Sequence, residues 1–489
     1  MSSEIDYTKL QRASAVPEAA PMIETFRAIG YSVETAIADI IDNSISAGAK
    51  NIWIKRIWRG GESVITIKDD GCGMTDDEIK NAMRPGSKNP LEERASKDLG
   101  RFGLGLKTAS FSQCRKLSVL SRSKKAKETN YWTWDLDFVA QSRSWDIIRW
   151  LPDEFKNELD DLASGTLIVW TDMDRVVPSD TPKTNEGAKR SFSTLLDRAK
   201  RHIAMTFHRF IESKRVKIFW GASEIEPWNP FFRFLPKTQE MPEEDLNGIR
   251  MQGFILPHKK EFKSGSELDA AGGLGGWVAM QGFYVYRNDR LLLAGSWLNI
   301  RPKREQYKLV RISIDLPNDC DAEWQIDIKK SKATPPALHL DQLRAYSQEC
   351  CNLGEKVYKN RGEIVRKRGK IEYQPLWLDK KTSDGKWSFV VNREHQMVLL
   401  AKKMAKQDPN GAIDTLLRLI ENALPTRTIY IKEATDECSE TLADEEEIEP
   451  LLRLCYEAKI KAGIPPKEAK QSLKATEPFN HYEEMIDEL

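Results

Sequence analysis

The sequence predicts an α+β protein that begins with an α/β sandwich and continues into a second α/β domain and a helical C-terminal region. Three observations predict this order. Apolar residues cover one helical face at 37–45, and a strand with alternating apolar residues follows at 64–67. Residues 276–295 have the pattern of a β-hairpin. Helical stretches occur at 395–406, 411–423 and 446–462, and 489 residues correspond to about three domains.

The predicted helix at residues 38–49 carries two polar residues four positions apart. Asp39 and Asn43 lie on the same helical face, because residues i and i+4 are neighbours there. A metal-bound phosphate requires an oxygen ligand for the ion and a carboxylate that orients a water molecule. Asn43 suits the first role and Asp39 the second. The alternative is a polar stripe on an ordinary surface helix.

The strand predicted at residues 64–67 leads into the glycine motif DDGCGM at residues 69–74. Gly71 and Gly73 allow the backbone to approach a flat ligand closely. The carboxylate of Asp69, at the end of the strand, can accept a hydrogen bond from an exocyclic amine, and Met74 can pack on a ring. Taken by itself, the same motif is also a common structural turn.

A second glycine-rich motif, GRFGLGLKTAS, covers residues 100–110. Its G-x-x-G-x-G spacing is the reverse of the dinucleotide-binding fingerprint, and it lacks the G-K-[ST] ending of a P-loop. A glycine-rich loop that opens a helix still binds phosphate groups through backbone amides and the helix dipole. Further along, residues 164–170 begin an apolar strand with the small hydroxyl residue Thr166 near its start.

These four elements, in this order and at these spacings, resemble the GHKL ATPase superfamily, which includes gyrase, the large heat-shock chaperone, MutL, MORC proteins and histidine kinases. The resemblance covers residues 20–175, and the full set of elements is far more specific than any one of them. It implies a Bergerat-type ATP-binding α/β sandwich that binds ATP and Mg²⁺ and hydrolyses the nucleotide.

The resemblance also assigns roles to individual residues. Asn43 would coordinate Mg²⁺, and Asp69 would recognise adenine in a pocket lined by Gly71, Gly73 and Met74. Thr166 would share the water network around the base. The triphosphate would be wrapped by a loop with Lys107 beside it, and this loop consists of Gly100, Arg101, Phe102, Gly103, Leu104, Gly105 and Leu106.

Asp39 departs from the usual pattern of the superfamily. Most hydrolysing members carry glutamate at this position, and aspartate is one methylene shorter. The attacking water must therefore sit closer to the helix, or hydrolysis is slow. Asp42, just before Asn43, is usual in several branches and is not the water-orienting position.

The predicted hairpin at residues 276–295, with Asn288 and Asp289 at its turn, resembles part of the transducer domain that follows the nucleotide domain in gyrase, MutL and MORC proteins. Histidine kinases lack this domain, and no phosphoacceptor helix is recognisable, so a kinase is excluded. Transducer domains usually direct one lysine to the γ-phosphate, where a cation stabilises transferring phosphoryl charge. Alignment of residues 326–328 with the MutL-type strand gives this role to Lys332, with Lys330 as the alternative. A basic loop after an edge strand is the other interpretation.

The sequence suggests five parts. They are an N-terminal arm at 1–20, an ATP-binding domain at 21–185, a transducer domain at 186–340, a basic helical connector at 341–374 and a helical C-terminal domain at 375–489. The last part contains no recognisable catalytic motif. The resemblance is therefore closest to stand-alone bacterial MORC- or MutL-like ATPases, which are often encoded beside helicases, nucleases or methyltransferases in phage-defence islands.

Composition excludes several other classes of protein. Seven cysteines without a C-x-x-C pair suit neither a disulfide framework nor a zinc site. No apolar run approaches the roughly 20 residues of a membrane span, and the first residues lack a hydrophobic signal core. We therefore expect a cytoplasmic protein with no membrane partner. The net charge of +1 indicates no particular partner.

Basic residues are nevertheless clustered locally. Each cluster is either a solvated surface or a surface that contacts phosphates. The two clusters of interest consist of Arg301, Lys303 and Arg304, and of Arg361, Arg366, Lys367 and Arg368.

Two functional classes remain open. The first is a slowly hydrolysing ATPase whose homodimer closes as an ATP-gated clamp on DNA of any sequence, in a phage-defence or DNA-processing system. The second is a nucleotide-gated protein scaffold, or a chaperone-like remodeller, with little hydrolysis. The resemblance adds a helicase, a nuclease or a methyltransferase as expected partner proteins.

Overall fold

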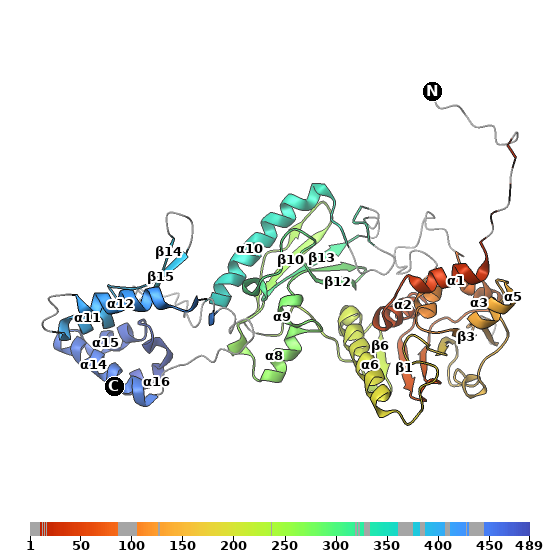
Figure 1. The fold of residues 1–489 in the computed structure, drawn as a ribbon, viewed down its shortest axis with the longest axis horizontal. Coiled ribbons are helices and arrows are strands. Elements are labelled where there is room, and N and C mark those ends of the chain that lie inside the picture. The colour runs from red at the N-terminus through yellow and green to blue at the C-terminus, as the bar shows by residue number, and fades with distance from the viewer. Residues whose placement is uncertain are drawn as a thin grey trace. The chain divides into compact units, whose positions relative to one another are not determined.

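The chain forms two compact units that divide between Lys359 and Asn360. The computed structural model describes residues 10–11, 13, 15, 17–86, 105–125, 128–235, 237–317, 320, 323–326, 333–359, 375–381, 387–405, 411–426, 428–429 and 445–489. Figure 1 labels the elements of both units. Most of the arm expected at residues 1–20 lies outside this range. Among the described helices, none is both long enough and apolar enough to cross a membrane.

The first unit begins with a seven-stranded sheet of order β4-β3-β5-β2-β1-β6-β7. Neighbouring strands are antiparallel except for β1 and β6, which are parallel. The strands are β1 (Asn51–Ile57), β2 (Val64–Asp69), β3 (Lys116–Arg122), β4 (Thr129–Asp135), β5 (Gly165–Thr171), β6 (Lys217–Trp220) and β7 (Ser223–Glu224).

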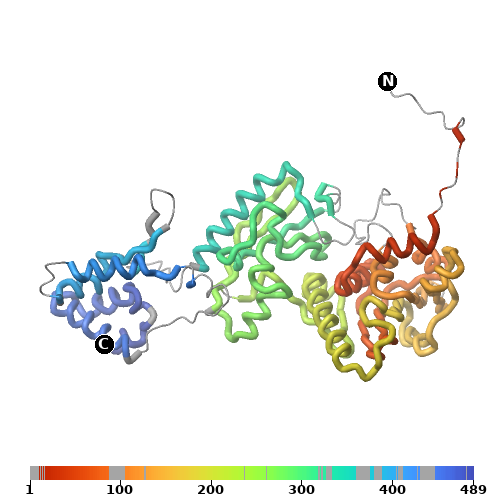
Figure 2. The backbone as a smooth tube through the Cα atoms, in the orientation of Figure 1, coloured from red at the N-terminus to blue at the C-terminus, as the bar shows by residue number. Residues whose placement is uncertain are grey.

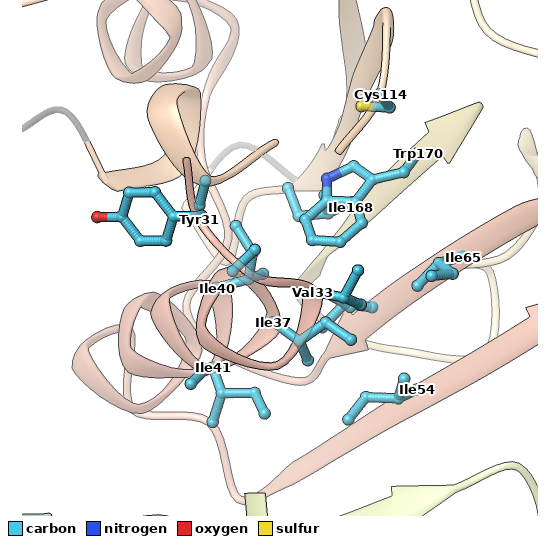
Figure 3. Close-up of a cluster of buried hydrophobic side chains, with 14 of the residues drawn as sticks. Tyr31, Val33, Ile37, Ile40, Ile41, Ile54, Ile65, Cys114, Ile168 and Trp170 are labelled. Atoms are coloured by element: carbon cyan, nitrogen blue, oxygen red, sulfur yellow. The ribbon is translucent and has the colours of Figure 1, made fainter. Parts of the chain in front are cut away.

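Helices cover one face of this sheet and enclose its main core. Ile37, Ile40 and Ile41 of α2 lie against Ile54 and Ile65 of the strands, as Figure 3 shows. Each fully buried isoleucine contributes about 1.5–3 kcal/mol relative to an exposed one. The helices of this part are α1 (Ala19–Ala28), α2 (Val33–Ser46), α3 (Asp76–Met83), α4 (Gly105–Phe111), α5 (Leu136–Ser142), α6 (Glu186–Thr206) and α7 (His208–Glu212).

The opposite face of the sheet is covered by residues 151–162, which lie between α5 and β5. Leu151, Phe155 and Leu159 of this segment pack on Val64 and Leu120 of the strands. Both faces of β2 are therefore buried, and every residue of that strand is inaccessible to solvent or nearly so. The α/β sandwich expected from the sequence is confirmed.

The first sheet extends beyond the boundary expected at residue 185. Figure 2 traces the chain from β5 through α6 and back into the sheet. Phe192, Leu196 and Ile203 of α6 belong to the same core as α2, and β6 pairs with β1. Residues 186–224 therefore complete the first sheet and its helical cover.

A second sheet follows in the same unit, in the order β12-β11-β13-β10-β8, with β9 beside β10. The long helix α10 packs against β10 and β13 of this sheet. The elements are β8 (Gln239–Glu240), β9 (Glu244–Asp245), β10 (Arg250–Ile255), α8 (Gly265–Gly272), α9 (Gly276–Ala279), β11 (Gly282–Arg287), β12 (Arg290–Ser296), β13 (Val310–Leu316) and α10 (Leu340–Lys359).

The predicted hairpin is present as β11 and β12. Asn288 and Asp289 form its two-residue turn with φ angles of +47° and +64°, the left-handed geometry that tight hairpins require. The hairpin is shorter than predicted, because residues 276–279 form the short helix α9. The predicted connector helix is α10, which the structure describes up to Lys359.

The second unit is mainly helical, as predicted. A core of Leu452, Leu473, Phe479 and Ile486 holds its helices together. A two-stranded hairpin, which the sequence did not indicate, precedes them; its first strand, WLDKK, is too short and too charged to show an apolar alternation. The elements are β14 (Trp377–Lys381), β15 (Trp387–Val391), α11 (Gln396–Met404), α12 (Ala412–Ala423), α14 (Glu445–Lys461), α15 (Pro466–Leu473) and α16 (Glu483–Glu488).

Candidate functional site

Helix α2 places Asp39 and Asn43 in two different environments. Ser32 caps the helix by accepting a hydrogen bond from the backbone amide of Thr35, and the isoleucines of α2 fix the opposite face in the core. Asp39 is only 5% exposed, whereas Asn43, one turn further on, is exposed. The helix therefore presents a buried carboxylate and, beside it, an amide that is accessible to a ligand.

The carboxylate of Asp39 is held by groups from two other segments. Its Oδ2 accepts a hydrogen bond from the hydroxyl of Tyr31 at 3.0 Å, and its Oδ1 lies 3.6 Å from Nη2 of Arg290. Burial, together with the adjacent Asp39 charge, raises the pKa of Tyr31 well above its usual value of 10. Tyr31 therefore remains a protonated donor, and Figure 3 shows its hydroxyl directed away from the apolar cluster.

Asp42 forms the main ion pair with Arg290. Nε of Arg290 donates to both carboxylate oxygens of Asp42, at 3.1 and 3.0 Å, and both side chains are almost completely buried. Arg290 begins β12, so this pair connects the second sheet to α2. Arg290 lies within the hairpin predicted at residues 276–295, but the sequence analysis did not assign it to the site. The only sequence signal that could have indicated this role is the resemblance of the hairpin to transducer domains.

Asp69 ends β2 and lies beneath the C-terminal half of α2. Its Oδ2 accepts a hydrogen bond from Ser44 Oγ at 2.8 Å, and its Oδ1 accepts one from the backbone amide of Gly71 at 2.9 Å. Burial raises the pKa of this carboxyl, although these hydrogen bonds oppose the shift. Ser44 follows Asn43 directly in the helix, but its role was not predicted.

Thr166 lies opposite Asp69 in the pairing of β2 with β5. Its hydroxyl is 2.9 Å from that of Ser121 on β3, and the hydroxyl of Ser121 also accepts a hydrogen bond from the backbone amide of Met74 at 2.9 Å. Ser121 thus joins two residues that the sequence placed in the adenine pocket. It was missed because no local motif marks it.

The glycines of the DDGCGM motif are required by close backbone contacts. Gly73 has a φ angle of +63°, and a Cβ atom at this position would lie 1.9 Å from the carbonyl oxygen of Arg122. A Cβ atom at Gly71 would lie 2.9 Å from both Asp69 Oδ1 and Ala47 Cβ. These glycines therefore allow the turn to pack against β3 and α2, which fixes Asp69 and Met74.

The start of α4 lies beside Asp39. A Cβ atom on Gly105 would be 3.5 Å from Asp39 Oδ2, and Leu106 is half-buried. Lys107 is 2% exposed and donates a hydrogen bond to the carbonyl oxygen of Ala82, near the end of α3, at 2.9 Å. The other predicted phosphate-loop residues lie outside the described residues, as do both candidate lysines: these are Gly100, Arg101, Phe102, Gly103, Leu104, Lys330 and Lys332.

One residue of the first predicted basic cluster makes contacts within the domain that contains the second sheet. Arg301 donates to Ser347 Oγ at 2.9 Å and to Gln348 Oε1 at 3.2 Å on α10, and its guanidinium lies over the ring of Trp297. Lys303 and Arg304 are exposed. The residues of the other cluster, Arg361, Arg366, Lys367 and Arg368, lie outside the described part of the chain.

The chemistry of this donor set fits a purine nucleotide with a divalent cation. Asp69 is an acceptor buried at the end of a strand, Met74 is half-buried beside it, and the hydroxyls of Ser121 and Thr166 are adjacent. The exposed amide of Asn43 supplies an oxygen of the type that Mg²⁺ prefers. The buried carboxylate of Asp39 lies one helical turn away on the same face.

This chain is similar to known proteins over part of its length. Residues 31–166 match the family described as "Histidine kinase-, DNA gyrase B-, and HSP90-like ATPase". The DNA mismatch repair protein MutL of Chlamydia abortus is 30% identical over 99 residues, which cover 19% of this chain and 17% of that protein. MutL of Escherichia coli is 33% identical over 118 residues, which cover 22% and 18%. The ATPase morc-1 of Caenorhabditis elegans is 28% identical over 117 residues, which cover 24% and 13%. The chain thus matches less than a fifth of the length of each of these relatives.

Proposed function

We propose that this protein, whose residues 31–166 form a GHKL ATPase domain related to those of MutL and MORC proteins, binds ATP with Mg²⁺, hydrolyses it slowly and acts as an ATP-gated dimeric clamp on DNA. The observation that carries the proposal is the buried carboxylate of Asp69 at the end of β2. It accepts from Ser44 and lies opposite Thr166, next to the exposed amide of Asn43.

Each polar residue of the site has a proposed role. Asp69 would accept a hydrogen bond from the exocyclic amine of adenine, with Gly71, Gly73 and Met74 around the ring and Thr166 sharing the adjacent water. Asn43 would supply an oxygen ligand to Mg²⁺, which would neutralise charge on the phosphates. The loop from Gly100 to Leu106, with Lys107, would surround the phosphates. Either Lys332 or Lys330 would approach the γ-phosphate.

Asp39 would act as the general base that orients and deprotonates the attacking water. Its carboxylate is buried and already contacts Tyr31 and Arg290, so its orientation is restricted. Aspartate also reaches one methylene less far than the glutamate usual in the superfamily. The shorter reach supports slow hydrolysis, because a proton acceptor must lie within hydrogen-bond distance of the water.

The clamp proposal rests on the resemblance to transducer-containing relatives. Closure of a symmetric dimer on ATP binding would enclose DNA in a cavity lined by the second sheet's domain. Lys303 and Arg304 are exposed there and would contact phosphates of any sequence. A cytoplasmic phage-defence or DNA-processing system, with a helicase, nuclease or methyltransferase partner, would be the setting.

A nucleotide-gated protein scaffold is the second candidate. Three basic residues are expected to line the cavity. One of them, Arg301, is hydrogen-bonded to Ser347 and Gln348 of α10. This leaves fewer cations for DNA in the described part of the chain. The short Asp39 side chain also favours a protein that is switched by nucleotide binding more than by rapid hydrolysis.

One experiment separates the two candidates. The ATPase rate of the purified protein is measured with and without duplex DNA over a range of salt concentrations. A clamp predicts stimulation by DNA that declines as salt rises, because phosphate contacts release counterions. ATP binding without any response to DNA at low salt would support the scaffold, and absence of ATP binding would refute both.

A further inference from the structure

Arg290 connects the second sheet to the candidate ATPase site. It is 4% exposed, and its guanidinium faces two carboxylates of α2: Nε donates to Asp42 at 3.1 and 3.0 Å, and Nη2 lies 3.6 Å from Asp39. Its Nη1 donates to the carbonyl oxygen of Leu291 at 3.0 Å. The guanidinium is therefore fixed at one end by its own strand and at the other by the helix that carries the proposed base.

Ion pairs hold the hairpin turn before Arg290 in place. Asp289 pairs with Arg209 at 3.4 Å and with Arg215 at 2.7 Å, and Arg209 also pairs with Asp315 of β13. These contacts anchor the hairpin to α7 and to the middle of the second sheet. A displacement of that sheet relative to α2 would therefore be transmitted to the Arg290 guanidinium.

The two oxygens of Asp39 face different parts of the molecule. Tyr31, from the loop before α2, donates to Oδ2, and Arg290, from the second sheet, lies beside Oδ1. A general base must direct a carboxylate lone pair at its water, so the plane of the carboxylate matters. Of these two contacts, only the one with Arg290 depends on the position of the second sheet.

We propose that Arg290 is a positioning residue of the ATPase site, which holds the carboxylate of Asp39 and couples its orientation to the second sheet. The inference rests on the proposed role of Asp39 as the base. Arg290 does not touch the reacting atoms. It acts on the site through its contact with Asp39, and its ion pair with Asp42 holds the guanidinium in place. This coupling is separate from the lysine that is proposed to approach the γ-phosphate.

The first test separates turnover from nucleotide binding. Arg290→Met removes the charge and keeps most of the side-chain length, and Arg290→Lys keeps the charge but loses the planar fork that faces two carboxylates at once. We expect kcat to fall at least tenfold in both variants, while the dissociation constant of a non-hydrolysable ATP analogue stays within threefold of wild type. Arg233→Ala, the matched control, removes an arginine of the same domain that pairs with Glu240 of β8 and is not part of the hairpin's anchoring contacts, and it should leave kcat unchanged.

The second test requires no nucleotide. Thermal unfolding is measured for Arg290→Met, for Asp42→Asn and Asp39→Asn, and for the two double variants that combine Arg290→Met with each of them. If the guanidinium holds both carboxylates, each second substitution should cost less stability in the Arg290→Met background than in wild type. Additive losses in both cycles would overturn the inference. The double variant with Asp42→Asn also removes both charges of the buried pair, so it should fold even if Arg290→Met alone does not.

The outcomes distinguish this inference from the proposed function. If Asp39→Asn hydrolyses ATP at the wild-type rate, the proposed base is wrong and the inference falls with it. If Asp39→Asn is inactive but Arg290→Met retains wild-type turnover, the positioning role alone is refuted. Loss of turnover in Arg290→Met, with retained analogue binding and non-additive unfolding, supports both.

Discussion

The hydroxyl of Ser44 donates a hydrogen bond to the carboxylate of Asp69 across 2.8 Å, and this contact joins helix α2 to the end of strand β2. Both side chains are buried. The contact fixes Asp69 relative to Asn43, the residue before Ser44, so that the proposed adenine-recognising acceptor and the proposed Mg²⁺ ligand belong to one rigid arrangement.

We expect Ser44→Ala to weaken ATP binding. The substitution removes one of the donors that hold Asp69. A buried group that loses its partner costs about 1–3 kcal/mol, which corresponds to a roughly 5- to 150-fold loss of affinity when this cost applies to the complex with ATP. Titration calorimetry with a non-hydrolysable ATP analogue measures the effect.

Ser118→Ala is the matched control for this prediction. Its hydroxyl is buried and lies 2.7 Å from that of Thr133, and among the described residues neither side chain is hydrogen-bonded to Asp69, Thr166 or Met74. We expect it to lower the unfolding temperature without changing the affinity for the analogue. Equal affinities of Ser44→Ala and wild type would contradict the assigned position of the adenine.

Asp39→Asn should preserve ATP binding and abolish turnover. The amide oxygen can still accept the hydrogen bond from Tyr31, but an amide cannot take a proton from water. Asn43→Ala should instead weaken Mg²⁺-dependent nucleotide binding, because it removes the proposed metal ligand. Steady-state hydrolysis and analogue titration with and without Mg²⁺ distinguish the two variants. Wild-type turnover by Asp39→Asn would show that another group is the base.

Lys332→Ala should lower the hydrolysis rate more than the affinity for ATP. A cation that approaches the γ-phosphate acts mainly on charge that develops during phosphoryl transfer. Lys330→Ala, two residues away, is the control with the same change of charge. If Lys330→Ala loses turnover and Lys332→Ala does not, the alignment of this segment is shifted by two residues.

A non-hydrolysable ATP analogue should convert the protein into a compact dimer. Dimer closure is a conformational step that the γ-phosphate stabilises in the proposed clamp. Light scattering reports the mass and small-angle scattering the shape, each with and without the analogue. Asn43→Ala should remain in the nucleotide-free state at the same analogue concentration. Unchanged mass and shape of the wild type at saturation would argue against a clamp.

DNA binding should be independent of sequence and should decline steeply with salt. Each neutralised phosphate adds about 0.9 to the slope of log affinity against log salt concentration. Reversal of Arg361, Arg366, Lys367 and Arg368 to glutamate should weaken binding and leave basal ATP hydrolysis intact.

The control for this reversal is an equal change of charge elsewhere on the surface. Four exposed lysines outside the proposed lining serve this purpose: Lys183, Lys189, Lys461 and Lys467. Their reversal should change DNA binding much less, and electrophoretic mobility shifts compare the two variants. No binding by the wild-type protein at low salt, with or without ATP, would refute the DNA clamp.

Local sequence patterns predicted the parts of the site that lie within one element. The isoleucine spacing of α2 and the alternation in β2 follow directly from helical and strand periodicity. The glycine motif after β2 was also recognisable, although the reason for Gly73, its contact with Arg122, was not.

Contacts between distant elements could not be predicted in the same way. Arg290 and Asp42 are 248 residues apart, and Ser121 reaches Thr166 through a strand pairing that no periodicity specifies. Such partners depend on strand order and on the packing of one sheet's domain against α2. The first sheet extends past the boundary expected at residue 185 for the same reason, because β6, a strand from later in the chain, pairs with β1 and completes the sheet.

The parallel pairing of β6 with β1 limits where the ATPase region can be cut. A fragment that ends at residue 185 would lack α6 and β6, so it would expose apolar residues of α2 and leave β1 as an unpaired edge. Open edges of this kind promote aggregation. A fragment of the ATPase region must therefore extend at least through Glu224 to keep both elements.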